Sequence, residues 1–238
     1  TLDNLTNSTY MLSGCDKLKE IEFNGNTLTK NLEDMTGMLN NYISLKYINA
    51  QMFKKNKLTK FNYVFKHCES LEEIDLSDFE SKNIIEINST FEGCYNLLNI
   101  NLTNFDTSKV TSMNFLFSYC ESLTYLDLSS FNLENLENSE GMFYNCLDLK
   151  QIKFNNNTST KNLFDMRLMF RDCVSLEYIH TKIFKGNQVT DLYGVFEDCY
   201  LLKKIDLSYF NQQKITNFKN TFKRCKSLSS INLTHFDI

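Results

Sequence analysis

Residues 96–120 read NLLNINLTNFDTSKVTSMNFLFSYC, and the same pattern of side chains returns along the whole chain. The recurrence is easiest to follow in the cysteines, which lie 26 or 27 residues apart except for a first gap of 53. Within that gap, Tyr42 stands at the position that a cysteine would take. The cysteines are Cys15, Cys68, Cys94, Cys120, Cys146, Cys173, Cys199 and Cys225. Together with Tyr42 they predict about nine stacked turns of about 26 residues.

Each turn contains two different spacings of apolar residues. After the cysteine position, apolar residues alternate with polar ones, as in Leu123, Leu126 and Leu128, which is typical of a short strand with one buried face. Before Cys120, apolar residues lie 3, 4, 7 and 10 positions back, which is the stripe of a short helix. Neither element can bury its apolar face alone, so the turns must stack. The sequence therefore predicts an α/β solenoid with a parallel sheet on one face and short helices on the other.

The repeated phrase LxxLDLSxFxTSxVTxMxxxFxxC closely resembles the BspA-like leucine-rich repeats of bacterial and protist surface proteins. Two turns depart from it: FNGNTLTKNL (23–32) and FNNNTSTKNL (154–163) carry one extra residue and lack an outer phenylalanine that other turns have. That phenylalanine follows the cysteine position by eleven residues, at Phe53, Phe79, Phe105, Phe131, Phe210 and Phe236. The resemblance implies a leucine-rich repeat fold, a cell-surface or extracellular location and a role in adhesion.

Composition excludes several classes of protein. The chain has 238 residues and a net charge of −4, which argues against a nucleic-acid-binding protein, because such a protein needs a basic face. No stretch approaches the roughly 18 apolar residues of a membrane span, so no direct membrane insertion is expected. We expect residues 1–238 to form a single solenoid that is a piece of a longer array. Seven Asn-X-Ser/Thr sequons occur, including those at Asn156 and Asn157, and chance explains most of them in so asparagine-rich a chain.

The regular cysteines have three interpretations. A zinc site would need closely spaced CxxC pairs, and the sequence has none. A complete disulfide ladder fails on parity, because Tyr42 separates Cys15 from seven cysteines in consecutive turns, although isolated bridges between neighbours stay open. Packing of small buried thiols is the favoured interpretation. It makes the structural core positions Cys68, Cys94, Cys120, Cys146, Cys173, Cys199 and Cys225.

The outward-facing strand residues form columns across the turns. Tyrosines and charges occupy the column five residues after the cysteine position, and Asp or Asn dominates the column seven residues after it. Bonds between Asp and Asn side chains of neighbouring turns would explain the second column structurally. Exposed tyrosines on a rigid sheet, by contrast, are good contact residues. The candidate binding residues are Tyr47, Glu73, Asp75, Tyr125, Asp127, Lys153, Tyr178, His180, Lys204 and Asp206.

Nothing in the sequence predicts an enzyme, a metal or a cofactor. The histidines fall at different repeat positions, and a triad of His180, Asp206 and Ser208 would lack a pocket and oxyanion donors. Stacked Asp75, Asn101 and Asp127 offer too few oxygens for calcium. We therefore predict a non-catalytic binding module for a protein or glycan on a host or neighbouring cell. The alternative is a structural spacer with no ligand of its own.

Overall fold

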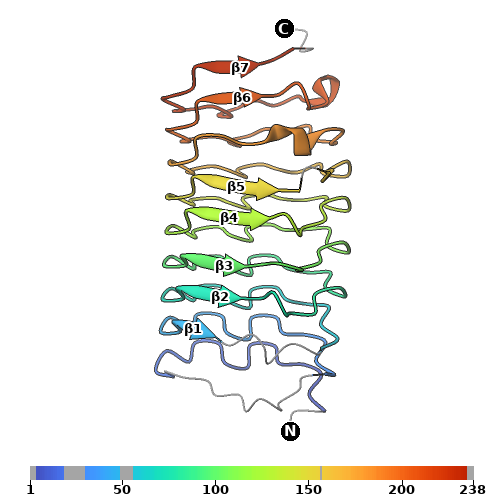
Figure 1. Ribbon diagram of the computed structural model, residues 1–238, viewed down its shortest axis with the longest axis vertical. Helices are drawn as coiled ribbons and strands as arrows, with labels where there is room; N and C mark the ends of the chain where they lie inside the picture. The colour runs from blue at the N-terminus through green and yellow to red at the C-terminus, as the bar shows by residue number, and fades with distance from the viewer. Residues whose placement is uncertain (1–3, 19–29, 49–55, 156, 235–238) are drawn as a thin grey trace.

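The computed structural model describes residues 4–18, 30–48, 56–155 and 157–234. Its turns stack along one axis, and the strands lie one above another on one side (Figure 1). Every strand pair is parallel, and the paired residues are 26 positions apart, as in Glu73 with Asn99. The strands are β1 (Tyr47–Ile48), β2 (Glu73–Asp75), β3 (Asn99–Asn101), β4 (Tyr125–Leu128), β5 (Gln151–Phe154), β6 (Lys204–Asp206) and β7 (Ser230–Asn232). The chain is a β-solenoid with about seven strand-bearing turns.

Two of the nine expected strands are not among these seven. The strand expected after Cys15 falls in residues 19–29, outside the described part of the chain. At Tyr178 no strand forms, and a 3-10 helix, η2 (Thr181–Phe184), follows it. In that turn His180 stands where most other turns have Asp or Asn. A second 3-10 helix, η3 (Gln212–Lys214), lies in the loop after β6.

The prediction of short helices on the other face is wrong. The segments before the cysteines are successive tight turns, and η2 and η3 are the helices within the described residues. Phe115 and Tyr119 have φ of 54° and 59°, a left-handed conformation that no right-handed helix tolerates. The N–H of Phe117 donates to Met142 of the next turn at 2.9 Å, instead of bonding within its own segment. Because these segments are turns, the fold is all-β rather than α/β. The sequence suggests helices because tight turns and helices place apolar residues at similar offsets.

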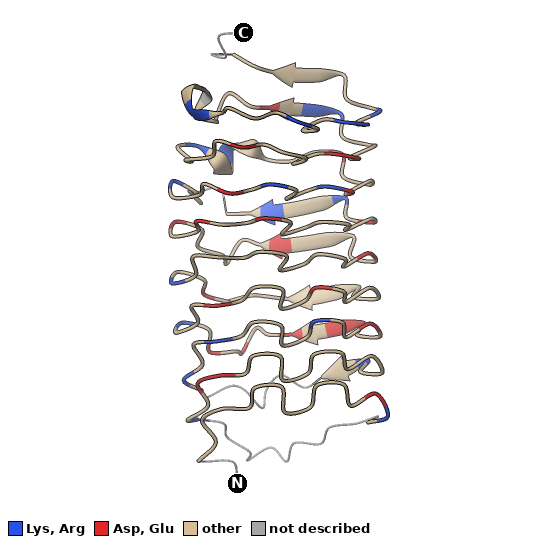
Figure 2. Cartoon of the chain, turned by 180° about the vertical axis from the view of Figure 1, so that it is seen from behind, with Lys and Arg blue, Asp and Glu red and all other residues tan. Residues whose placement is uncertain are grey.

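A second line of pairing runs along the face opposite the strands. Single parallel bridges join the residues eight positions before the cysteine register, and Figure 2 looks onto this side of the stack. We call it the rear ladder. Its bridges join Asn7 to Asp34, Asp34 to Lys60, Lys60 to Glu86, Ser112 to Asn138, Asn138 to Asp165, Asp165 to Asp191 and Asp191 to Asn217.

The interior is a column of stacked phenylalanines beside a column of thiols. The rings three residues before each cysteine from Cys68 to Cys225 stack almost parallel, with centroids 5.5 Å apart from Phe91 to Phe117 and 5.9 Å from Phe117 to Phe143. Each thiol of the structural core donates to the backbone carbonyl of a residue 29 or 30 positions earlier, at 3.0–3.2 Å. All eight cysteines lie in described parts of the chain and are free. The cysteines from Cys68 to Cys199 are buried in the packed interior, Cys15 and Cys225 are half-buried, and no disulfide joins any of them.

A shorter aromatic column lies under the loops that follow the strands. Phe79 stacks on Phe105 and Phe105 on Phe131, with centroids 5.7 and 5.9 Å apart. The column resumes with Phe184 and Phe210 at 5.3 Å. The repeat pattern described above omits Phe184 from this column, although Phe184 also follows a cysteine, Cys173, by eleven residues. The interruption falls at the loop after β5, one of the two that carry an extra residue.

Candidate binding surface

The outward side of β1–β7 is the candidate binding surface, which we call the strand face. Strand residues alternate between exposed and buried, so those five positions after the cysteine register point outward. Tyr47, Tyr125 and Tyr178 share this register and are 61%, 46% and 55% exposed. The strand face therefore presents large aromatic side chains at the same repeat position of separate turns.

Polar contacts hold two of these tyrosines in place. The Tyr47 hydroxyl donates to Glu72 Oε2 at 2.9 Å, and this bond raises the pKa of Tyr47 and lowers the pKa of Glu72. The Tyr125 hydroxyl lies 3.4 Å from Asp127 Oδ2, which also forms an ion pair with Lys153 at 2.7 Å. Burial raises the pKa of Asp127, but hydrogen bonds from Lys153 and Ser129 outweigh it and lower the pKa to about 2.

The third tyrosine packs against the histidine. The rings of Tyr178 and His180 meet edge to face at 5.0 Å, and the Tyr178 hydroxyl is 3.4 Å from His180 Nδ1. Asp206 instead accepts the backbone N–H of Ser208 at 2.9 Å. His180 thus contacts Tyr178, whereas the hypothetical triad requires a contact between His180 and Asp206. Lys204 lies beside Ser230 on the last strand pair.

The Asp and Asn column has a local structural role. In each strand-bearing turn from β2 to β4, the side-chain oxygen accepts the backbone N–H two residues on, an Asx turn that ends the strand. For Asp75 the hydrogen bonds from Ser77 lower the pKa. Hydrogen bonds from Asn101 and Asn232 of the following turns also lower the pKa of Asp75 and Asp206, so the bonds across turns that the sequence predicts accompany the local ones. Asp75, Asp127 and Asp206 therefore shape the loops that follow the strands.

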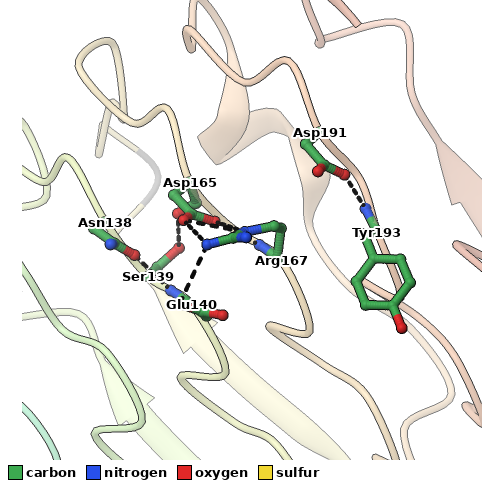
Figure 3. Close-up of polar contacts among 7 residues, drawn as sticks. All are labelled: Asn138, Ser139, Glu140, Asp165, Arg167, Asp191 and Tyr193. Carbon is green, nitrogen blue, oxygen red and sulfur yellow. Dashed lines mark hydrogen bonds and ion pairs between the residues drawn. The ribbon is translucent and has the colours of Figure 1, made fainter. Parts of the chain in front are cut away.

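The rear ladder repeats the same device and was missed from the sequence. Asn138, Asp165 and Asp191 each accept the backbone N–H two residues on, and Figure 3 shows the first and last of these bonds, to Glu140 and Tyr193. Arg167 clamps Asp165 with two nitrogens at 3.0 and 2.7 Å and reaches Glu140 at 3.5 Å. The sequence does contain a signal for these turns, since Asp, Asn or Ser recurs eight residues before the cysteine position. The spacing of these residues does not by itself distinguish an Asx turn from other structures.

A buried charge cluster also escaped the sequence analysis. Glu197 and Asp198 are each 1% exposed, beside the buried Cys199. Glu197 pairs with Lys223 at 2.7 Å and with Arg171 at 3.4 Å, and Asp198 pairs with Arg224 at 2.5 Å. Cations of the preceding and following turns thus neutralise both carboxylates, so the cluster joins neighbouring turns.

Within the described ranges, no group of three or more His, Cys, Asp or Glu side chains is placed to hold a metal ion. A search of the same residues finds no helix long and apolar enough to cross a membrane.

Fold and surface together define a class: a repeat β-solenoid that displays columns of exposed side chains on a parallel sheet. The chain belongs to the family described as "Mycoplasma protein of unknown function, DUF285", whose model matches residues 6–99, 59–179 and 153–238. A comparison with curated proteins gave no match.

Solved structures similar to the chain include bacterial leucine-rich repeat proteins. A leucine rich cell surface protein from Faecalibacterium prausnitzii is 16% identical, with 97% of this chain and 77% of that one covered and a TM-score of 0.48. A leucine-rich repeat protein from Eubacterium ventriosum is also 16% identical, covering 96% and 70%, with a TM-score of 0.41. One from Bacteroides ovatus is 18% identical, covering 95% and 64%, with a TM-score of 0.34. Sequence identities and TM-scores this low do not indicate a shared function.

Proposed function

We propose that this chain is a non-catalytic recognition module of the cell surface or the extracellular space that binds a partner protein through its strand face. The observation that carries the proposal is the column of three exposed tyrosines that share one position in separate stacked turns. Tyrosine offers a large contact area for few rotatable bonds, and it is enriched where proteins bind each other.

The tyrosines are partly ordered before any partner arrives. Bonds to Glu72 and Asp127 restrict Tyr47 and Tyr125, and the His180 ring restricts Tyr178. Ordering a side chain on binding costs about 0.5–1.5 kcal/mol, so restriction in the free protein favours affinity. This arrangement supports recognition over a broad area rather than in one pocket.

Charge on the strand face changes along the stack. Acidic side chains lie on β2 and β4 and a basic one on β5, whereas β6 carries both Lys204 and Asp206 (Figure 2). The Asp127–Lys153 pair lies at the boundary and neutralises itself. A partner with the opposite gradient would dock in one orientation, because complementary charges fix register and speed association.

The test measures binding of the fragment to extracellular matrix proteins, glycans and intact cells. A Tyr125→Ala, Tyr178→Ala variant should lose binding by about tenfold or more, because aromatic anchors dominate interface energy. Phe164→Ala is the matched control: Phe164 is also exposed, but its N–H joins the bonds of the rear ladder, on the opposite side. Thermal unfolding of all three proteins shows whether they are equally folded.

Two outcomes would replace the proposal. Binding that Phe164→Ala removes and the tyrosine variant keeps would move the site to the rear face. No saturable binding to any member of the panel would favour the spacer, which needs only the stack. Labelling of intact source cells with an antibody to the fragment tests the surface location.

A further inference from the structure

The interrupted aromatic column marks a change in the loop after β5. In the loop after β4, the N–H of Phe131 donates to the carbonyl of Leu128 at 3.0 Å. The corresponding bond after β5 runs from the N–H of Thr158 to the carbonyl of Asn155, also at 3.0 Å. Thr158 also precedes Cys173 by fifteen residues, as Phe131 precedes Cys146. A half-buried threonine thus takes the place of a stacking phenylalanine.

A pocket of about 310 Å³ lies beside Thr158, between two consecutive loops. One wall comes from the loop after β4 and the other from the loop after β5. Phe131 and Asn132 lie in the first wall, and Asn155, Thr158 and Ser159 in the second. A volume of this size is at the lower end of the range of small-molecule sites, about 300–1,000 Å³.

The lining consists mainly of hydrogen-bonding groups. The Oδ1 atoms of Asn132 and Asn155 accept backbone N–H groups at 2.9 and 3.0 Å, which leaves their Nδ2 groups as donors. The hydroxyls of Thr158 and Ser159 add donors and acceptors, and the buried Phe131 closes the floor. This mixture of amides and hydroxyls matches a ligand that carries several hydroxyl groups.

Charge narrows the ligand class further. Glu134 is the charged residue of the lining, and its carboxylate already pairs with Lys161 at 2.5 Å. An anionic ligand would face this carboxylate, and a cationic one would compete with Lys161. We propose that the pocket binds the sugar ring of a neutral glycan.

The probes are methyl α-glucoside, methyl α-mannoside, methyl β-galactoside and N-acetylglucosamine, each at millimolar concentration. Saturation-transfer NMR should detect contact with one or more of them, and amide shifts should cluster at residues 130–134, 155 and 157–159. The protein must come from a host without N-glycosylation, because a glycan on the Asn157 sequon would occupy the site itself. No transfer from any of the four sugars, or shifts confined to other loops, overturns the proposal.

Thr158→Phe is the decisive variant, because it restores the side chain that the other turns carry and fills the space. It should weaken sugar binding by about tenfold or more while leaving the midpoint of thermal unfolding unchanged or higher. Glu80→Ala, an exposed change in the loop after β2, is the matched control and should bind as the parent does. Undiminished binding by folded Thr158→Phe contradicts the pocket.

A second variant covers the case in which phenylalanine disturbs the loop. Asn157→Ala with Ser159→Ala removes two polar groups of the lining without adding bulk and should also reduce binding. If this variant binds as the parent does, the proposal fails. The pocket is independent of the strand face, since the tyrosine variant should bind these sugars normally and Thr158→Phe should keep the protein partner.

Discussion

At the scale of single residues, the thiols are the most regular feature of the interior. Cys146 donates to the carbonyl of Phe117 at 3.0 Å and is wholly buried. Burial raises the pKa of Cys146 to about 12 and that of Cys68 also to about 12, because a thiolate would have no water around it. These cysteines are therefore protonated packing groups at neutral pH and poor nucleophiles.

Alkaline pH should destabilise the fold through these thiols. The unfolded chain releases thiol protons near the usual pKa of 9, whereas folded Cys146 keeps its proton until about 12. Between those values the unfolded state binds fewer protons, so its free energy falls relative to the folded state as pH rises. The contribution of each thiol to the free energy of unfolding is complete below pH 9. Above pH 9 it declines by about 1.4 kcal/mol per pH unit for each thiol.

Urea unfolding at pH values on either side of 9 measures this effect. Cys146→Ala should show a shallower decline than the parent by the share of one thiol. The comparison cancels the tyrosines that also titrate in this range. Equal slopes for the two proteins would show that the thiol proton does not contribute.

The rear ladder provides a second test at the residue scale. Asp191 accepts the N–H of Tyr193 at 2.7 Å, so Asp191→Ala should lower the free energy of unfolding by about 1–2 kcal/mol. Asp191→Asn should be nearly neutral, because Asn138 and Asn217 serve at the same position of other turns. Thr190→Ala changes an exposed neighbour and is the control for the effect of a surface substitution that removes no Asx turn. Denaturant unfolding that places Asn beside Ala rather than beside Asp would argue against the Asx turn.

At the scale of elements, the strands were predictable and the segments before the cysteines were not. Strand alternation has a period of two that no other local structure shares, so the Leu126 register and the outward columns followed directly. Tight turns and a helix place apolar residues at the same offsets and differ in the sign of φ at two positions. Glycine and asparagine at some of these positions, such as Gly93 and Asn145, indicate a positive φ. Phe115 and Leu168 also have a positive φ, but their residue types do not indicate it.

The candidate site divides in the same way. Exposure of Tyr47 or Tyr125 follows from the strand period. Their bonds to Glu72 and Asp127 depend on side-chain rotamers. The burial of Glu197 depends on cations that stacking brings from the two neighbouring turns, 26 residues away in sequence. The pocket beside Thr158 required knowing which loop residue replaces the phenylalanine.

Two glycines measure how tightly successive turn segments pack. Gly141 has φ of 58°, and a Cβ there would lie 2.3 Å from the Phe115 ring of the preceding turn. Gly186 has φ of 81° with no atom within 4 Å of the same point. Gly141→Ala should therefore cost clearly more stability than Gly186→Ala, which pays about 1–2 kcal/mol for its backbone alone. Urea unfolding of both variants gives the comparison, and equal losses would mean that Phe115 moves aside freely.

At the scale of the whole molecule, each turn contacts its neighbours and little else. The Phe117 ring touches the column at Phe91 on one side and Phe143 on the other, and the thiol and backbone bonds likewise join adjacent turns. Stability in such a stack approximates a sum of turn energies and interfaces between neighbours. A defect in one interface should therefore stay local.

Phe117→Ala tests this in the middle of the stack. Deleting a fully buried ring should cost about 3–5 kcal/mol. Because the loss falls on two interfaces, hydrogen exchange should accelerate mainly in the turns that contain Cys94, Cys120 and Cys146. The turns that contain Cys199 and Cys225 should keep their protection, since their own interfaces are intact. Exchange that accelerates equally in every turn would instead show that the solenoid unfolds as one cooperative unit.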